Sequence, residues 1–458
     1  MEIFIQAILL AVLGGIIFTI IGIVPGTDET ATMAPLTLIL VLLGFQPPVL
    51  FAWYMAIIAA MQIAHVIPTA MAALPGSTMN VPMVYNCSLA KRMGIPHVAI
   101  RKMAAGSLIG QLIAFPIAIL FALALAPVGQ LITPYVGLVF TIGTVVVAYM
   151  SRAKWGAIAA IIPFAFLIQG FQRLAVESVG KTLFISIFMG ITIGPMIAEI
   201  FNVMIPSQRS KQMKDKPNEI WLAPEQNLRS KSIFPNPFKI LTKRQNVKTL
   251  INSAISTCTF TMSPVGMTVM LGELSVKKKP ELYDKVTTTL AVQESVTNAT
   301  YTGGLIIPLI AFLGLPLSAI AVGPAAPLFN APPVFTVDPL HNLGSLMTLP
   351  NYIIFGIIGI IGGVIISYPV SIKKARSWTL ILFKKIGHEA LIGAFVGLIC
   401  LLAFHEAGFM GIIVALSLGL IGGFLHTHFG IHTGVQFMAY YASGWIVTNL
   451  FLLAKIVV

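Results

Sequence analysis

Charged side chains are scarce in this chain. Its 458 residues include 28 Lys and Arg and 15 Asp and Glu, so only 9% are charged, whereas 57% are hydrophobic. A soluble globular protein carries roughly 25% charged residues on its water-facing surface. The composition therefore excludes a soluble globular protein and predicts an integral membrane protein surrounded by the lipid bilayer.

Cysteine is scarce as well. The three cysteines, Cys87, Cys258 and Cys400, are far apart in the sequence. Their spacing matches neither a disulfide framework nor a structural zinc site. We therefore expect no metal centre and no cofactor.

Acidic residues are the rarer of the two charge types, and the net charge is +13. The segment 206–248 alone holds ten Lys or Arg against three acidic residues, and so contributes +7 of this charge. Basic loops between apolar segments mark the cytoplasmic side of a membrane protein. The segment lacks the interleaved aromatic residues of a nucleic-acid-binding surface. We predict a basic cytoplasmic loop and no nucleic-acid partner.

What the chain has in abundance is continuous apolar sequence, as in Tyr352–Ile366. Because a helix that crosses the bilayer takes roughly 20 residues, the chain has room for about 10 to 12 transmembrane helices. Shorter runs, such as Ala31–Gly44, are typical of broken or re-entrant helices. We predict an all-α, multi-pass protein of the cell membrane (plasma or inner). Its predicted parts are a first membrane half (1–205), the basic loop (206–248), and a second half with the C-terminal helices (249–458).

The two halves share a pattern of Pro and Gly interruptions. In the first half, Val24-Pro25-Gly26-Thr27 is followed fifty residues later by Leu74-Pro75-Gly76-Ser77. In the second half, Ser263-Pro264-Val265-Gly266 is followed fifty-two residues later by Leu315-Pro316-Leu317-Ser318. Paired interruptions in two halves point to a transporter binding site at the interface of an inverted repeat. The alternative is four ordinary kinks or turns between spans.

Polar groups and freed backbone groups at these breaks are the candidate solute contacts. A break at membrane depth is tolerated only where protein or a water-filled cavity satisfies the freed backbone groups. The predicted solute-binding residues are Pro25, Gly26, Thr27, Gly76, Ser77, Thr78, Asn80, Ser263, Gly266 and Ser318.

Acidic residues near the breaks are the candidate sites for a coupling ion. A carboxylate at the centre of a membrane helix costs roughly 2.5 to 3.5 kcal/mol on insertion scales, so Asp28 and Glu29 need a cation, a proton or water nearby. Glu294 and Asn298 are four residues apart and so share one helix face. Carboxylate and amide oxygens suit sodium, and a carboxylate alone suits a proton. The alternatives are an interfacial turn for the first pair and a polar helix end for the second.

Several stretches resemble the large membrane subunit of the tripartite tricarboxylate transporter family. They are Gly22-Ile23-Val24-Pro25-Gly26-Thr27, Leu74 to Ser77, Leu89-Ala90-Lys91-Arg92-Met93-Gly94, Gln293-Glu294-Ser295-Val296-Thr297-Asn298-Ala299, Gly303-Gly304-Leu305-Ile306-Ile307-Pro308-Leu309 and Leu315-Pro316-Leu317-Ser318. The chain departs from the family pattern at the breaks.

The departures are specific. The family usually has Pro-Gly-Leu-Gly at the first break, where this chain has Thr27 and Asp28 after Pro-Gly. A glycine-rich stretch before the second break is replaced by Gln62–Val66. The third break is Ser-Pro-Val-Gly in place of Pro-Gly-Thr-Gly, and the fourth is Pro-Leu-Ser in place of Pro-Gly-Ser.

The resemblance implies symport of small carboxylates such as citrate, driven by a sodium or proton gradient. It also implies two partners, a small membrane subunit and an extracytoplasmic solute-binding protein. Half-helix N-termini are suited to a carboxylate. Asp28 and Glu29, however, place negative charge where an anion is expected. Either they hold the coupling cation, or the solute is cationic or zwitterionic.

An intramembrane metal-dependent enzyme is the competing class. His405-Glu406-Ala407-Gly408-Phe409 begins like the zinc-protease motif HExxH, but Phe409 stands where the second His is required. His426, His428 and His432 follow at close spacing, yet residues two apart diverge by about 160° on a helix. We predict no catalytic residue.

Overall fold

The computed structural model describes residues 2–24, 27, 29–72, 76–132, 135–151, 153–183, 185–207, 232–261, 264–275, 281–312, 314, 315, 317–329, 343–374, 388–431 and 433–454. Its helices in the first half are α1 (Glu2–Gly22), α2 (Glu29–Leu42), α3 (Pro47–Ala64), α4 (Val66–Ala72), η1 (Thr78–Met83), α5 (Val84–Arg92), α6 (Pro96–Ile132), α7 (Val136–Met150), α8 (Trp155–Val179) and α9 (Ile185–Met204). Those in the second half are α11 (Pro237–Ile240), α12 (Lys243–Cys258), α13 (Pro264–Leu274), α14 (Leu282–Ala311), α15 (Ala319–Val322), η3 (Ala326–Leu328), α16 (Leu343–Leu346), α17 (Leu349–Lys373), α19 (His388–Phe429) and α20 (Thr433–Leu453).

The all-α membrane fold is confirmed. No strand occurs among the described residues. Within the described part of the chain, seven helical segments are long and apolar enough to cross a membrane. Helices such as α2, with 14 residues, and α13, with 11, are too short to span the bilayer. The total of ten to twelve spans stays a prediction.

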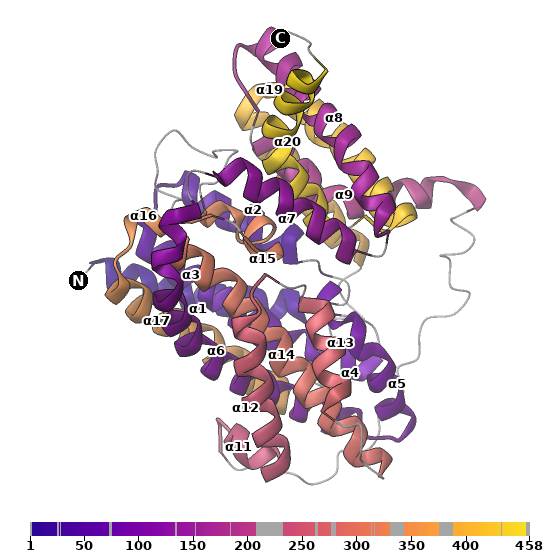
Figure 1. Ribbon diagram of the computed structural model, residues 1–458. Helices are drawn as coiled ribbons and strands as arrows, with labels where there is room; N and C mark the ends of the chain where they lie inside the picture. The colour runs from indigo at the N-terminus through magenta and orange to yellow at the C-terminus, as the bar shows by residue number, and fades with distance from the viewer. Residues whose placement is uncertain are drawn as a thin grey trace.

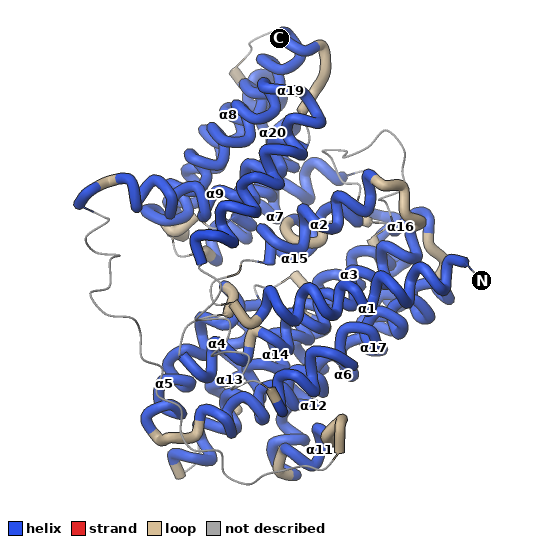
Figure 2. The backbone as a smooth tube through the Cα atoms, turned by 180° about the vertical axis from the view of Figure 1, so that it is seen from behind, coloured by secondary structure: helices blue, strands red, loops and turns tan. Residues whose placement is uncertain are grey.

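A central bundle is formed by α1, α3, α6, α12, α14 and α17 (Figure 1). Helix α6 packs along α14, and α3 packs along both α17 and α1, while α12 packs along α14. Figure 2 shows the same bundle from behind. Each membrane half therefore contributes three of these helices. The two most extensive helix interfaces in the bundle, α6 with α14 and α3 with α17, join helices of different halves.

Small residues allow these cross-half contacts. A Cβ added at Gly106 of α6 would lie 2.3 Å from the carbonyl oxygen of Ala291 in α14. A Cβ at Gly363 of α17 would lie 2.3 Å from the carbonyl oxygen of Ala56 in α3. One turn away, the same closeness recurs for Gly110 with Ser295 and for Gly359 with Ala52. The two helix pairs thus use the same close, glycine-based packing that is common between membrane helices.

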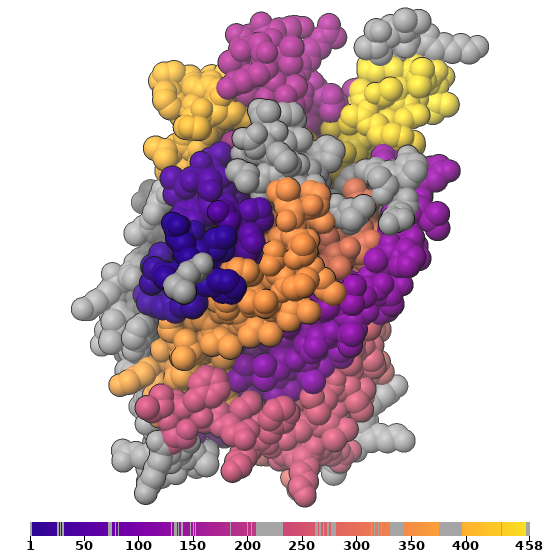
Figure 3. All heavy atoms as spheres, turned by 90° about the vertical axis from the view of Figure 1, so that its left-hand side faces the viewer, coloured from indigo at the N-terminus to yellow at the C-terminus, as the bar shows by residue number. Residues whose placement is uncertain are grey.

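The outer face of the central bundle is apolar. In Figure 3, the chain segments of α1, α17, α6 and α12 lie side by side across one face of the molecule. Large exposed hydrophobic side chains occur on each of them: Ile8 and Leu9, Ile357 and Ile361, Leu112 and Leu120, and Ile251 and Ile255. Such a surface is expected to face lipid.

A second, C-terminal bundle is formed by α7, α8, α9, α19 and α20 (Figure 1). Helices α2 and α15 lie between the two bundles: α2 contacts α9 and α19, and α15 contacts α20. The short helices that follow the first and fourth breaks therefore connect the two bundles.

Helix α14 is continuous from Leu282 to Ala311, although two apolar runs of the sequence, 286–300 and 305–325, are separated by a Gly pair within it. Its 30 residues include Gly303, Gly304 and Pro308, which disfavour a helix interior. Tertiary packing overrides that preference, because a Cβ at Gly303 would lie 2.4 Å from the carbonyl oxygen of Thr257 in α12. Glycine is required there for α12 and α14 to approach.

Part of the predicted basic loop is helical. Residues 208–231 lie outside the described part, but α11 and the start of α12 fall within 206–248. Thr242 and Gln245 form a capping box that begins α12. Lys102 of α6 donates hydrogen bonds to the carbonyl oxygen of Ile240 (2.6 Å) and to Oε1 of Gln245 (2.9 Å). Because the same segment carries Lys239, Lys243 and Arg244, this end of the central bundle is basic.

Candidate functional site

The first two helix breaks lie against each other inside the protein. Helix α1 ends at Gly22, and α2 begins at Glu29, whose carboxylate Oε1 lies 3.8 Å from Nδ1 of His65. His65 separates α3 from α4 and is fully buried, and Glu29 is only 2% exposed. An isolated carboxylate would be costly when buried, and the imidazole offers it a polar partner.

Thr27 joins these breaks on the other side of the imidazole. Its hydroxyl donates to the carbonyl oxygen of Val24 (3.1 Å) and lies 3.4 Å both from His65 Nε2 and from the carbonyl oxygen of Gly76. The N–H of Gly76 donates to Thr69 Oγ1 (3.0 Å). Only glycine fits at position 76, because a Cβ there would lie 2.7 Å from the carbonyl oxygen of His65. The second break is thus fixed by its contacts with the first.

A hydrogen bond then joins the first half to the second. Ser77 donates to Oδ1 of Asn80 (3.1 Å), and Nδ2 of Asn80 donates to Oε2 of Glu294 (3.2 Å). Helix α13 also packs against η1, and its Thr268 hydroxyl lies 2.8 Å from that of Thr297 in α14. The segment after the second break therefore lies against the second half.

We call Thr27, Glu29, His65, Ser77, Asn80 and Glu294 the polar cluster; all six are buried. Two of them are carboxylates, which lie close enough to repel each other when both are ionised. Oε1 of Glu294 and Oδ1 of Asn298, one turn further along α14, are buried without a hydrogen-bond partner. Among the residues that the structure describes, no Lys or Arg is buried and no three His, Cys, Asp or Glu form a metal-binding group. The cluster is rich in acceptors and poor in cations.

The remaining predicted residues are distributed as follows. Pro25, Gly26, Asp28 and Ser263 lie outside the described residues, and for Thr78 and Gly266 the structure describes only the helical backbone. Asn298 donates from Nδ2 to the hydroxyl (3.0 Å) and the carbonyl oxygen (3.1 Å) of Ser107 in α6. Ser318 begins α15, where its hydroxyl accepts from the N–H of Ala321 (3.1 Å) and donates to the carbonyl oxygen of Gly304.

Ser318 therefore contacts α14 ten residues after Glu294, roughly 15 Å along a helix. No described contact joins it directly to the polar cluster. The region around the fourth break contacts the first half at another point. There η3 packs against α2, and the Tyr301 hydroxyl of α14 donates to Met33 Sδ of α2 (3.3 Å).

Sequence reasoning missed His65 and Thr69. For His65 a signal was present, since Gln62–Val66 replaces a glycine-rich stretch of the family pattern and contains a Gln and a His. Neither a lone His nor a lone Thr in an apolar run identifies its partner, however. Gln62, one turn before His65, is fully buried with neither amide atom hydrogen-bonded.

The enzyme-like motif has a structural role. Helix α19 is broken at Ala407 and Gly408, and Gly408 has φ 59° and ψ −142°, a conformation that favours glycine. The Glu406 carboxylate accepts hydrogen bonds from the N–H groups of Ile185 (2.8 Å) and Ser186 (2.7 Å), and from the Ser186 hydroxyl (2.6 Å). It caps the N-terminus of α9. His426 and His428 lie in the last turn of α19, and His432 is outside the described residues.

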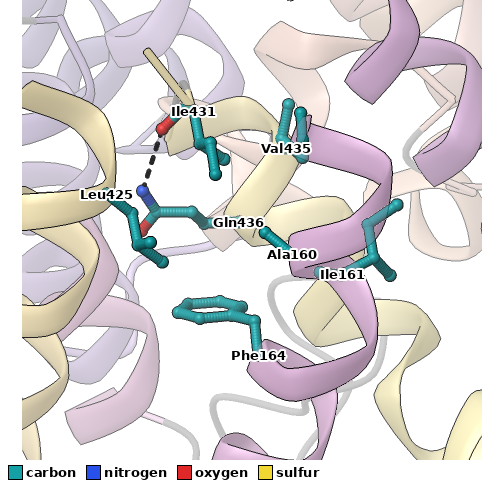
Figure 4. Close-up of a pocket in the computed structure, with 9 residues that line it drawn as sticks. Ala160, Ile161, Phe164, Leu425, Ile431, Val435 and Gln436 are labelled. Atoms are coloured by element: carbon teal, nitrogen blue, oxygen red, sulfur yellow. Dashed lines mark hydrogen bonds between the residues drawn. The ribbon is translucent and has the colours of Figure 1, made fainter. Parts of the chain in front are cut away.

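A small pocket lies elsewhere, between α8, α19 and α20 (Figure 4). Its lining is apolar, including Ile161, Phe164 and Leu425, apart from Gln436. The Gln436 amide donates to the carbonyl oxygens of Gly422 (2.8 Å) and Ile431 (3.1 Å). Because its lining holds no charged group, this pocket is a weaker candidate for binding an ion or a charged solute than the polar cluster.

Comparison with known proteins gives one match. The model of the family described as "Tripartite tricarboxylate transporter TctA family" matches residues 8–433. No curated protein and no solved structure matches the chain.

Proposed function

Because the chain belongs to the tripartite tricarboxylate transporter TctA family, we propose that it is the permease of a secondary active transporter. It imports a small organic solute with a carboxylate group, coupled to a sodium or proton gradient. The observation that carries this proposal is the polar cluster, in which the Asn80–Glu294 hydrogen bond joins the two membrane halves at a helix break.

Matched packing in the two halves supports an internal repeat. Gly106 and Gly110 of α6 lie against α14 in the way that Gly359 and Gly363 of α17 lie against α3. In addition, η1 of the first half packs on α13 of the second, and η3 of the second packs on α2 of the first. These reciprocal contacts are what two related halves around a common centre would produce.

The coupling cation is assigned to the carboxylates of the cluster. Glu294 Oε1 and Asn298 Oδ1 are two buried oxygens with no hydrogen-bond partner on successive turns of α14. Oxygen ligands of this kind suit a hard cation, and a carboxylate alone suits a proton. Glu29 belongs to the same negatively charged region, and Asp28 is its neighbour in the sequence.

The solute carboxylate is assigned to the broken helices. Helices α2 and α13 both begin at a break, and their first backbone N–H groups have no partner within the helix. These N-termini also carry the positive ends of the helix dipoles, which favour an anion. The predicted contacts at Pro25, Gly26, Gly76, Ser77, Thr78, Ser263, Gly266 and Ser318 stay part of this proposal.

The partners follow from the family. A small membrane subunit and an extracytoplasmic solute-binding protein would work with this permease, and the membrane is assigned as the cell (plasma or inner) membrane. The basic end of the bundle, where Lys102 contacts the segment before α12, would face the cytoplasm.

The test is solute uptake by purified protein in proteoliposomes, with both partner subunits added, under an imposed sodium or proton gradient. Labelled carboxylates and amino-carboxylates are supplied outside. We expect accumulation that requires one of the two gradients and disappears when it is collapsed. Equal movement of every solute with and without a gradient would contradict the proposal.

A further inference from the structure

The charges of the polar cluster restrict the solute more narrowly than the family description does. The cluster holds two buried carboxylates: Glu29 lies against the imidazole of His65, and Glu294 accepts a hydrogen bond from Asn80. In the described part of the chain no buried Lys or Arg accompanies them. Even with His65 protonated, the cluster has no net positive charge to offer an anion.

A tricarboxylate is a poor fit for such a site. It would bring three negative charges to a place that already holds two carboxylates, in a buried region where an uncompensated charge is strongly unfavourable. The N-terminus of α13 contributes only the equivalent of roughly half a positive charge. One coupling cation would balance the charge of Glu294, and would leave the three charges of a tricarboxylate without a buried Lys or Arg among the described residues.

Hydrogen-bonding capacity gives a second, independent indication. Oε1 of Glu294 is fully buried and has no donor, although Oε2 of the same group accepts from Asn80. The buried amide of Gln62, one turn from His65, has no partner for its oxygen or for its nitrogen, so it can accept from an ammonium group and donate to a carboxylate. Acceptors without donors are matched by a ligand that brings donors, and an ammonium group brings three.

We infer that the solute is an amino-carboxylate with net charge zero or positive, and not a tricarboxylate. This inference rests on the proposed transport function. The ammonium group faces the carboxylates of Glu29 and Glu294, and the carboxylate of the solute faces the N-terminus of a broken helix such as α13. Two of the chain's departures from the family pattern, at Thr27 and at Gln62–Val66, fall at this cluster, to which they contribute Thr27 and His65.

The experiment measures thermal unfolding of the purified full-length protein in lipid nanodiscs, in sodium-containing, divalent-free buffer. The probes are citrate and tricarballylate on one side, and the neutral and basic amino acids on the other. We expect at least one amino-carboxylate to raise the unfolding temperature, with an apparent affinity at least about tenfold tighter than that of citrate.

Charge-removing variants sharpen the result. Glu29→Gln and Glu294→Gln should each weaken the stabilising amino-carboxylate by at least about tenfold while leaving citrate unchanged or tighter. Glu281→Gln, at the exposed start of α14, is the matched control and should leave both affinities unchanged.

Three outcomes are decisive. Stabilisation by citrate or tricarballylate equal to or stronger than that by every amino-carboxylate overturns the inference and leaves the proposed transport function in place. Stabilisation by none of the probes contradicts both. Tighter amino-carboxylate binding that is unchanged in both charge-removing variants overturns the assignment to Glu29 and Glu294.

Discussion

The central and C-terminal bundles bury different kinds of side chain. Helix α14, in the central bundle, buries a carboxylate, an amide and several hydroxyl groups at Glu294, Asn298, Thr297 and Thr302. In the C-terminal bundle, α8 buries Ala157, Ile161 and Phe164, and its pocket is apolar except for Gln436. Stability alone gives no reason to bury the carboxylates and amides of the central bundle, because each must be satisfied.

The two bundles also use their carboxylates differently. Both carboxylate oxygens of Glu406 accept hydrogen bonds from the start of α9, whereas one carboxylate oxygen of Glu294 has no hydrogen-bond partner. A carboxylate whose two oxygens are both hydrogen-bonded holds the structure together. A buried carboxylate with one oxygen free of hydrogen bonds is available to a ligand. This difference separates the proposed transport site from the surrounding scaffold, and the predictions below test it.

The largest effect is expected at Glu294. Replacing it with Gln keeps the hydrogen bond with Asn80 and removes the charge, so gradient-driven accumulation should fall at least about tenfold while solute exchange partly survives. Asp28→Asn should give a related defect. Uptake and exchange are measured in the same proteoliposomes. Normal accumulation by both variants would remove these residues from the coupling site.

Next in size are the close contacts between helices. Gly106→Ala and Gly363→Ala each place a methyl group against backbone, and each should destabilise the protein by about 1 to 3 kcal/mol. If the halves are related, the two losses should be similar. Gly170→Ala, on α8 with nothing within 4 Å of its Cβ, is the control and should be neutral or stabilising. Thermal unfolding measures all three, and a loss confined to one interface would argue against matched halves.

A smaller effect is expected at Glu406. Glu406→Gln weakens the cap of α9, and we expect a loss of about 1 to 2 kcal/mol with no change in solute affinity per folded protein. Glu177→Gln, which removes an exposed ion pair with Arg173 in the same bundle, should change neither property. A loss of coupled transport in folded Glu406→Gln protein would show that the C-terminal bundle is more than a scaffold.

The smallest effect on stability is expected for the cysteine substitution that tests the orientation in the membrane. Ser232→Cys, placed in a background without Cys87, Cys258 and Cys400, should leave stability unchanged because Ser232 is exposed. If the basic end faces the cytoplasm, membrane-impermeant thiol reagents should label it only after the cells are opened. Labelling in intact cells would reverse the orientation.

The sequence was most informative where chemistry is local. Pro and Gly interruptions marked the ends of α1 and α4 and the start of α13, and the polar run around Glu294 stood out within an apolar chain. The composition predicted the all-α membrane fold. The family resemblance was visible in the motifs and was confirmed by the match over residues 8–433.

What the sequence could not predict depends on contacts between distant residues. The proximity of Glu29 to His65 and the Asn80–Glu294 hydrogen bond join residues 36 and 214 positions apart. The continuity of α14 through Gly303 depends on α12, which lies against it. The cap that Glu406 provides for α9 likewise needs the packed helices.

The central claim is that one cluster, built by both halves, binds cation and solute together. The most direct test is to measure how solute affinity depends on the coupling cation. The affinity is obtained from thermal unfolding at low and high sodium and at two pH values. Because coupling between two ligands is reciprocal, wild-type protein and Glu281→Gln should bind solute at least about tenfold more tightly with the cation. Glu294→Gln should lose this dependence, and Asn80→Ala should weaken it. Full cation dependence in both of these variants would contradict the account.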